Sequence, residues 1–297
     1  MASKSVVIGG GTGFIGTHLS NLLKKSGYNV LTVSRLPGLN RITWHQLNEN
    51  GLPNDTVAAV NVAGQNVLDP TRLWTSGFQQ NVWNSRINTT ATFVRAITNA
   101  KTKPNVFVSI SGVSLYRPSD SKIYTEDEKG EDFDYMSNLC LHWEKAAELP
   151  PEVKTRLVRI RTGVVIGRNG GMIKSLKLPF WFGFGGKIGA GTQPLPWIHI
   201  EDLCQLIKYS IENDKVNGVL NGVAPDIITN DDFTKAFGSV MRRPTFFTTP
   251  EFVIRNLFGK ERAAILLTGA KIQPKRTLEL GFQYKYPKVI DACREVC

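Results

Sequence analysis

A glycine-spaced segment near the start of the chain constrains its fold more than any other feature. Residues 6–9 form a short apolar run, and an amphipathic stretch begins a few positions later and ends at Lys25. Between them stand Gly10, Gly13 and Gly16. The first glycine permits a tight turn, the second lets the backbone approach a bound group, and the third lets the helix pack closely on the strand. This strand, turn and helix predict a Rossmann-type unit that binds a pyrophosphate at the amino terminus of its helix.

Apolar and amphipathic segments then alternate along the first half of the chain. Short runs rich in β-branched residues predict parallel strands, and the longer segments between them predict helices. The expected strands are residues 6–9, 30–34, 58–62, 106–109 and 157–161, and the expected helices are residues 13–25, 79–99 and 135–148. The sequence therefore predicts an α/β fold of the Rossmann type, with a doubly wound parallel sheet.

The amino-acid composition of the chain changes after residue 162. Glycine and proline are dense through residues 167–196, and helical patterns return at residues 201–212, 230–241 and 250–267. We expect residues 1–165 to form an NADP-binding Rossmann domain, with its sheet open to completion by later residues. Residues 166–297 are expected to form a smaller, interleaved C-terminal region that binds substrate over the carboxyl edge of the sheet, where ligands of such folds lie.

The end of the second expected strand indicates which dinucleotide binds. NAD-selective Rossmann units place a carboxylate there, which accepts hydrogen bonds from the ribose 2′-hydroxyl. This strand ends instead at Ser34 and Arg35, which can donate a hydrogen bond to a 2′-phosphate and pair with its charge. We therefore expect NADP(H) as the cofactor. The loop residues expected to contact it are Gly10, Thr12, Gly13, Phe14, Ile15 and Gly16.

Composition and charge disfavour several other classes of function. The chain has 36 Lys and Arg residues against 25 Asp and Glu, but its cations are scattered and accompany no RNA- or DNA-binding motif. No apolar run is long enough to span a bilayer, and the four cysteines lack the spacing of a zinc site. Because the first strand begins near residue 6, we expect no signal peptide and an intracellular, soluble protein of the cytoplasm or mitochondrial matrix. No metal, nucleic-acid partner or membrane partner is expected.

Several segments together resemble the extended and atypical short-chain dehydrogenase/reductases. They are residues 9–16, the Ser34-Arg35 pair, and residues 61–64, 85–90, 161–167 and 196–203. The match is more specific to the "epimerase family protein" branch, family 39U of that superfamily, which also carries a C-terminal region similar to residues 263–286. The resemblance covers essentially the whole chain.

The resemblance implies a set of residues that contact NADP(H) in addition to the glycine loop, Ser34 and Arg35. It places Val62 and Ala63 under the adenosine and ribose, and it implies contacts at Asn81, Arg86 and Val165. Asn81 stands where that branch is expected to have glutamate, which leaves this contact open. For Arg86 the alternative is an ordinary charge on a helix surface.

The resemblance also directs attention to a proton donor. The superfamily ordinarily uses a Tyr and, four residues later on the same helix, a Lys whose ammonium lowers the pKa of the phenol. Aligned on Glu144, this chain has Met136 and Cys140 at those two positions, so the standard pair is absent. The remaining candidates for proton donation, each with a packing or loop role as the alternative, are Ser111, Tyr116 and Tyr135.

We therefore expect an NADP(H)-dependent oxidoreductase that acts by hydride transfer on an unknown small, partly apolar substrate, without the Tyr–Lys pair. The alternative is a non-enzymatic NADPH-binding sensor or assembly protein. A sugar-nucleotide epimerase is disfavoured by the cofactor preference and by the missing pair. The expected partner is a small molecule, and a homodimer stays open.

Overall fold

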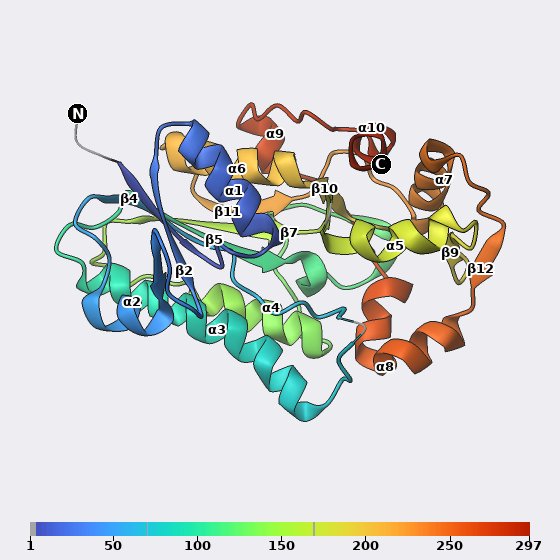
Figure 1. The fold of residues 1–297 in the computed structure, drawn as a ribbon, viewed down its shortest axis with the longest axis horizontal. Coiled ribbons are helices and arrows are strands. Elements are labelled where there is room, and N and C mark those ends of the chain that lie inside the picture. Colours follow the sequence, from blue (N-terminus) through green and yellow to red (C-terminus); the bar gives the residue numbers. More distant parts are fainter. Residues whose placement is uncertain (1–3, 70, 169) are drawn as a thin grey trace.

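The computed structural model describes residues 4–69, 71–168 and 170–297. Its centre is a seven-stranded sheet in the order β11-β7-β5-β4-β1-β2-β3, with every pair of neighbours parallel (Figure 1). The strands are β1 (Ser5–Gly9), β2 (Asn29–Ser34), β3 (Arg41–Thr43), β4 (Thr56–Asn61), β5 (Val106–Gly112), β7 (Arg156–Thr162) and β11 (Gly218–Gly222). The chain runs outward from β1 in both directions, so the sheet is doubly wound and its order reverses between β1 and β4.

Helices cover both faces of this sheet. The first layer consists of α1 (Phe14–Lys25) and α6 (Ile200–Glu212), and the second of α2 (Trp44–Asn50), α3 (Ser76–Asn99) and α4 (Tyr135–Ala146) (Figure 1). Successive residues of β1 alternate between the layers, because Val6 and Ile8 pack in the core under α1 and α6 whereas Val7 packs with α2 and α3. The apolar run of β1 therefore lies in the middle of a sheet that is covered on both faces.

The C-terminal region continues from the end of β7 and is built from short strands and helices. Its parallel strand pairs are β8 (Val164–Ile166) with β10 (Trp197–His199) and β9 (Gly186–Ile188) with β12 (Phe247–Thr249). Its strand β13 (Ala270–Ile272) pairs in parallel with β6 (Ser119–Tyr124), which precedes β7 in the chain. Its helices are α5 (Gly171–Trp181), α7 (Asn230–Met241), α8 (Glu251–Leu267), α9 (Lys275–Glu279) and α10 (Val289–Val296), and the 3₁₀ turn η1 (Val113–Leu115) follows β5. The buried side chains of Phe180, Phe233 and Trp197 form its core.

The helix α8 connects this region back to the nucleotide-binding half. Arg262 is buried in it and donates from Nη1 to the carbonyl oxygen of Asp69 at 3.1 Å. Its guanidinium lies 5.3 Å from the ring centroid of Trp74, whose indole N–H donates to Glu261. These contacts fix α8 against the loop that precedes α3.

The fold class predicted from the sequence is confirmed. All five expected strands and all six expected helices are present, with bounds that differ by at most three residues. β11 and α6 come from residues 166–297 yet belong to the main sheet and its cover, so the two expected ranges interleave. The sequence did not reveal α5, which lies in the glycine- and proline-rich stretch, or the three-residue strands, which are too short to show a period. It also did not reveal β6, β11, α2, α9 and α10, all of which are eight residues or shorter. Among the described residues, no helix is long and apolar enough to cross a bilayer.

Candidate functional site

The glycine loop makes two close backbone contacts as it leaves β1. Gly10 has a φ of +75°, and a Cβ there would lie 2.7 Å from the Cα of Ala63. A Cβ on Gly16 would lie 2.2 Å from the carbonyl oxygen of Gly10. No side chain fits at either distance, so the tight turn and the close helix–strand packing expected of these two glycines are present.

Gly13, between them, has fewer close neighbours. It is exposed, and a Cβ there would meet only the carbonyl oxygen of Gly10 at 3.3 Å. Gly13 is also the N-cap of α1, and no side chain accepts a hydrogen bond from the first turn of that helix. The free N–H groups and the positive end of the helix dipole therefore face solvent beside the exposed Thr12. Phe14 and Ile15 follow, half-buried, and complete a ready-made anion site.

Ser34 and Arg35 lie where β2 ends. Ser34 is buried and its hydroxyl donates to the carbonyl oxygen of Leu36 at 2.6 Å, whereas Arg35 is exposed. The sequence from residue 26 to residue 48 contains no Asp or Glu. In β3, the Nε of Arg41 is buried and has no hydrogen-bond partner among the described residues. This edge of the sheet therefore carries two arginines and no carboxylate of its own.

The end of β4 forms the other side of the loop. The N–H of Val62 donates to the carbonyl oxygen of Gly9 at 3.0 Å. Asn61 accepts from the N–H of Ala63 at 3.1 Å, and its Nδ2 donates to Oγ1 of Thr90 in α3 at 2.9 Å. Val62 and Ala63 are both buried. Asn61 thus positions the backbone that the sequence predicted under the cofactor, a role that its residue type alone did not reveal.

Arg86 projects from α3 toward the same end of β4. Its guanidinium lies 5.1 Å from the ring centroid of Trp143, and a Cβ on Gly64 would lie 3.1 Å from its Cζ. Its Nη1 donates to the carbonyl oxygen of Val82 at 3.1 Å. Burial lowers the pKa of Arg86 to about 10, and no carboxylate pairs with it within the described part of the chain. A desolvated cation without a carboxylate partner favours an anionic ligand.

Asn81 and Val165 supply no charge to this site. Asn81 is exposed in the first turns of α3, and Val165 is half-buried in β8, where it pairs with Ile198 and packs on the main core. Any contact that these two residues make with a dinucleotide is therefore polar or apolar rather than ionic. Their roles stay predictions.

The hydroxyls of Ser111 and Tyr116 have partners inside the protein. Ser111 donates to Oε1 of Glu144 at 2.8 Å, and Tyr116 donates to Oδ1 of Asn221 at 2.9 Å. Arg161 links the two hydrogen bonds. Its Nε donates to Oε1 of Glu144 at 2.8 Å, and its Nη1 donates to the hydroxyl oxygen of Tyr116 at 2.7 Å. Burial raises the pKa of Tyr116. Sequence reasoning used Glu144 only as an alignment anchor and gave no signal for this network, since its members come from different elements.

The third candidate, Tyr135, begins α4. Its hydroxyl donates to the carbonyl oxygen of Gln79 at 2.8 Å, and its ring lies edge-on to Trp74 with centroids 5.3 Å apart. Burial raises the pKa of Tyr135. In this structure all three predicted hydroxyl donors are therefore bonded to protein acceptors.

The sequence alignment on Glu144 assigned Cys140 to the position of the superfamily's lysine. Cys140 is buried, and a Cβ on Gly112 would lie 3.0 Å from its Sγ. Burial raises the pKa of Cys140 to about 12, so the thiol is neutral at physiological pH. Neither Cys140 nor Met136 supplies the positive charge that normally lowers the pKa of the catalytic phenol.

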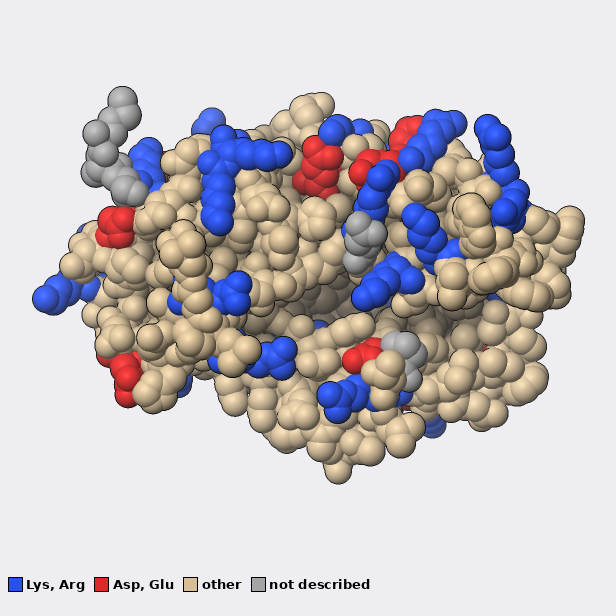
Figure 2. All heavy atoms as spheres, in the orientation of Figure 1, with Lys and Arg blue, Asp and Glu red and all other residues tan. Residues whose placement is uncertain are grey.

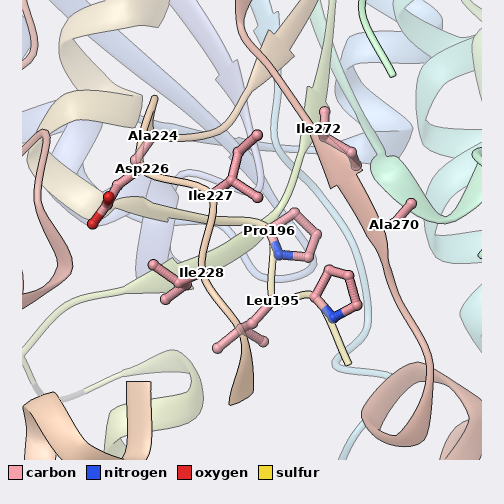
Figure 3. A pocket seen from close by; sticks show the side chains of 9 residues that line it. Leu195, Pro196, Ala224, Asp226, Ile227, Ile228, Ala270 and Ile272 are labelled. Atoms are coloured by element: carbon pink, nitrogen blue, oxygen red, sulfur yellow. The ribbon is translucent and has the colours of Figure 1, made fainter. Parts of the chain in front are cut away.

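The surface of the molecule is hollowed in the middle of the face shown in Figure 2, and lysine and arginine side chains stand along the rims of this hollow. A separate apolar cavity, lined by residues that include Leu195, Ile228 and Ile272, is shown in Figure 3. Its volume of about 10 Å³ is at most enough for one water molecule, so it is no substrate pocket.

Comparison with known proteins assigns the chain to a family. Residues 6–140 match the NAD dependent epimerase/dehydratase family, and residues 249–296 match a domain of unknown function, DUF1731. The epimerase family protein SDR39U1 of Bos taurus is 48% identical over 292 residues, which are 98% of this chain and 99% of that protein. This chain belongs to the SDR39U1 epimerase family.

A solved structure of this family is that of the human epimerase family protein SDR39U1 with NADPH. It is similar to this chain with a TM-score of 0.96 and 47% sequence identity, covering 98% of both chains. The UDP-N-acetylglucosamine 4-epimerase from Bacillus cereus shares the fold, with a TM-score of 0.77 at 17% identity over 99% of this chain and 98% of that one. The resemblance drawn from the sequence is therefore confirmed at the level of the SDR39U1 family.

Proposed function

We propose that this chain binds NADPH along the carboxyl edge of its sheet. The observation that carries the proposal is the open amino terminus of α1 above Gly13, next to a β2 end that carries Ser34 and Arg35 and no carboxylate. A pyrophosphate fits the free N–H groups of that helix, and a 2′-phosphate fits the cationic edge. The family supports this, because its human member was solved with NADPH.

The residues present also fit the rest of a dinucleotide. The buried backbone of Val62 and Ala63 offers an apolar floor to the adenosine, and the unpaired guanidinium of Arg86 offers positive charge beside it. Asn81 and Val165 would supply uncharged contacts along the same edge. The residue types therefore agree with the negative charge and the mixed polarity of the proposed ligand.

For the chemistry, we propose an NADP(H)-dependent oxidoreductase that acts on a small, partly apolar substrate. Bound NADPH supplies a hydride to an electrophilic carbon. The protein's own contribution is to orient the substrate and to provide a proton without a Tyr–Lys pair. Among the predicted donors, Tyr135 is the least buried, and its hydroxyl must leave the carbonyl oxygen of Gln79 to reach a substrate.

One observation favours a second function, a non-enzymatic NADPH-binding sensor or assembly protein. The hydroxyls of Ser111, Tyr116 and Tyr135 are all bonded to protein acceptors. Cys140 replaces the cation that would activate a phenol. A protein arranged in this way can bind the cofactor tightly and turn it over slowly or not at all.

Calorimetric titration with NADPH and NADH tests the cofactor assignment. Wild-type protein is expected to bind NADPH more tightly, and Arg35→Ala is expected to weaken NADPH binding by about 10- to 100-fold, the worth of a charge-assisted hydrogen bond. Arg95→Ala is the matched control, because Arg95 is exposed on α3. Equal affinities of the wild type and Arg35→Ala for NADPH would overturn the assignment.

Stopped-flow absorbance of the nicotinamide tests the chemistry. Wild-type protein with NADPH is mixed with a panel of aldehydes and ketones of graded apolar size. Oxidation of NADPH in a single turnover supports the oxidoreductase, and its loss in Tyr135→Phe identifies the proton donor. Tight binding without oxidation across the panel supports the sensor instead.

A further inference from the structure

A second surface of the molecule is rich in exposed aromatic side chains. The exposed fractions are 56% for Trp181, 65% for Phe182, 67% for Phe184, 90% for Phe246 and 53% for Phe247. These five residues, here called the distal aromatic surface, come from the end of α5 with the segment that follows it, and from the start of β12 with the residue before it. Both elements lie at the end of the C-terminal region farthest from α2 and β2 (Figure 1). The surface is therefore separate from the cofactor site.

Contacts between distant segments hold parts of the distal aromatic surface together. The rings of Phe184 and Phe247 have centroids 5.7 Å apart, and Phe247 of β12 pairs with Gly186 of β9. Arg243 donates from Nε to the carbonyl oxygen of Trp181 at 2.8 Å, and its guanidinium lies 5.0 Å from the Trp181 ring. Residues far apart in the sequence thus contribute to this surface.

The backbone under this surface is well packed. Phe180, between the exposed side chains and the core, is buried with its ring 4.8 Å from that of Phe237. A Cβ on Gly186 would lie 1.7 Å from the carbonyl oxygen of Phe247, which shows how closely the two strands approach. The aromatic side chains are exposed because the packed backbone directs them outward, at a cost in hydration that favours a partner.

The two segments that carry this surface are positively charged, and the carboxylates at their border, Asp231 and Glu251, pair with Lys235 and Arg255. Residues 171–189 contain three lysines and residues 242–250 contain two arginines, and neither segment contains an Asp or Glu. The cations are Lys174, Lys177, Lys187, Arg242 and Arg243. Two copies of this surface would bring these charges against each other, which opposes self-association, whereas a partner with dense negative charge is attracted.

We propose that the distal aromatic surface docks this protein onto an anionic lipid bilayer. Trp and Phe side chains favour the interfacial layer of a membrane, and Lys and Arg beside them are attracted to anionic headgroups. Such docking needs no membrane-spanning helix. The expectation from the sequence that there is no membrane partner rested on the lack of a spanning segment, and it therefore does not bear on docking to a bilayer surface. The nucleotide-binding half then faces away from the bilayer.

Vesicle flotation tests this proposal with the full chain. The vesicles are phosphatidylcholine alone, and an equal mixture of phosphatidylcholine and phosphatidylglycerol. The wild type is expected to float with the anionic vesicles only, and high salt is expected to release it because the headgroup attraction is screened. Wild-type protein that stays at the bottom with both vesicles, or that floats equally with both, overturns the proposal.

Variants assign the binding to this surface. The double variant Phe182→Ser, Phe246→Ser is expected to abolish flotation, and Lys187→Gln with Arg242→Gln is expected to weaken it by about fivefold for each cation removed. Leu39→Ser is the matched control, because Leu39 is 95% exposed but lies between β2 and β3. Thermal unfolding of each variant reports whether it is folded, which is expected since the changed side chains are exposed.

Two further outcomes count against the proposal. If Leu39→Ser reduces flotation as much as the double variant does, the binding is not specific to this surface. If sedimentation velocity shows a wild-type dimer that Phe182→Ser, Phe246→Ser dissociates, while no vesicle binds, the surface joins two copies of the chain instead.

Discussion

The hydroxyl of Ser111 donates a 2.8 Å hydrogen bond to the carboxylate of Glu144, and the same carboxylate accepts two further bonds from the guanidinium of Arg161. Desolvation by burial lowers the pKa of Arg161, but the hydrogen bonds and the charge of Glu144 raise it, and the net shift is upward. Glu144 and Arg161 therefore form a buried ion pair, and Ser111 donates a hydrogen bond to it, so that the three residues join α4, β7 and β5. Ser111 lies in β5, next to its last residue, and its hydroxyl is engaged by this buried pair.

Glu144→Gln is expected to destabilise the protein by about 3–5 kcal/mol, because it leaves the buried charge of Arg161 without a partner. Ser111→Ala is expected to cost about 1 kcal/mol and to leave NADPH affinity unchanged. Urea unfolding measures both free energies of unfolding. Asp214→Asn is the control, since Asp214 pairs with Arg156 but is 90% exposed, and a loss below about 1 kcal/mol is expected. A Glu144→Gln protein as stable as this control contradicts the interpretation.

Gly13→Ala is expected to separate cofactor binding from folding. A Cβ at Gly13 would crowd only the carbonyl oxygen of Gly10, at 3.3 Å, but it occupies the space above the amino terminus of α1, where a pyrophosphate must approach. The thermal unfolding temperature should change little, and NADPH affinity should fall at least tenfold. Gly77→Ala, in the first turn of α3, controls for the general effect of a glycine replacement in a helix. Unchanged affinity in Gly13→Ala would show that no phosphate binds at this helix.

Arg86→Met tests the unpaired guanidinium on α3. Methionine keeps the packing against Trp143 and removes a desolvated charge, so the free protein is expected to be as stable as the wild type or more stable. NADPH affinity is expected to fall by about tenfold or more, the worth of a hydrogen bond to a charged group. Calorimetric titration and thermal unfolding measure the two effects. If Arg95→Met, on the exposed face of the same helix, weakens binding equally, the charge of Arg86 has no specific role.

The stability of the protein is expected to fall as the pH decreases below about 6.5, the usual pKa of histidine. His199 is buried at the start of α6, where its Nδ1 lies 3.3 Å from the N–H of Glu201 and its Nε2 lies 3.1 Å from Glu295. Burial lowers the pKa of His199, although the Glu295 carboxylate opposes the shift. Below the unfolded pKa the unfolded chain therefore binds more protons than the folded protein, and protonation favours unfolding.

His199→Gln keeps a side-chain N–H for Glu295 and removes the titration. Urea unfolding between pH 5 and pH 8, a range of about one to two units around the histidine pKa, measures the slope. The slope is expected to be smaller in His199→Gln than in the wild type and unchanged in His45→Gln, which replaces a histidine exposed on α2. Identical slopes in all three proteins exclude His199 as the titrating group.

Much of the site was predictable because it depends on local backbone chemistry. The spacing of Gly10, Gly13 and Gly16 after an apolar strand leaves few conformations, and the structure has the predicted turn and helix start. The choice of Ser34 and Arg35 over a carboxylate can be read from one strand end. The role of Asn61 was not predictable, since its amide joins a backbone N–H to a threonine 29 residues away.

By itself, the sequence determined five of the seven strands of the main sheet, its main helices and the phosphate-binding turn, because strand and helix periods and glycine conformations are set within a few residues. Only the tertiary structure decided what the candidate hydroxyls do. Tyr116 meets Asn221 from a position 105 residues away, and Ser111 meets Glu144 from 33 residues away. The tertiary structure alone also brought Phe184, which follows α5, against Phe247 of β12. Such contacts depend on which elements pack together, and no local pattern in the chain encodes that.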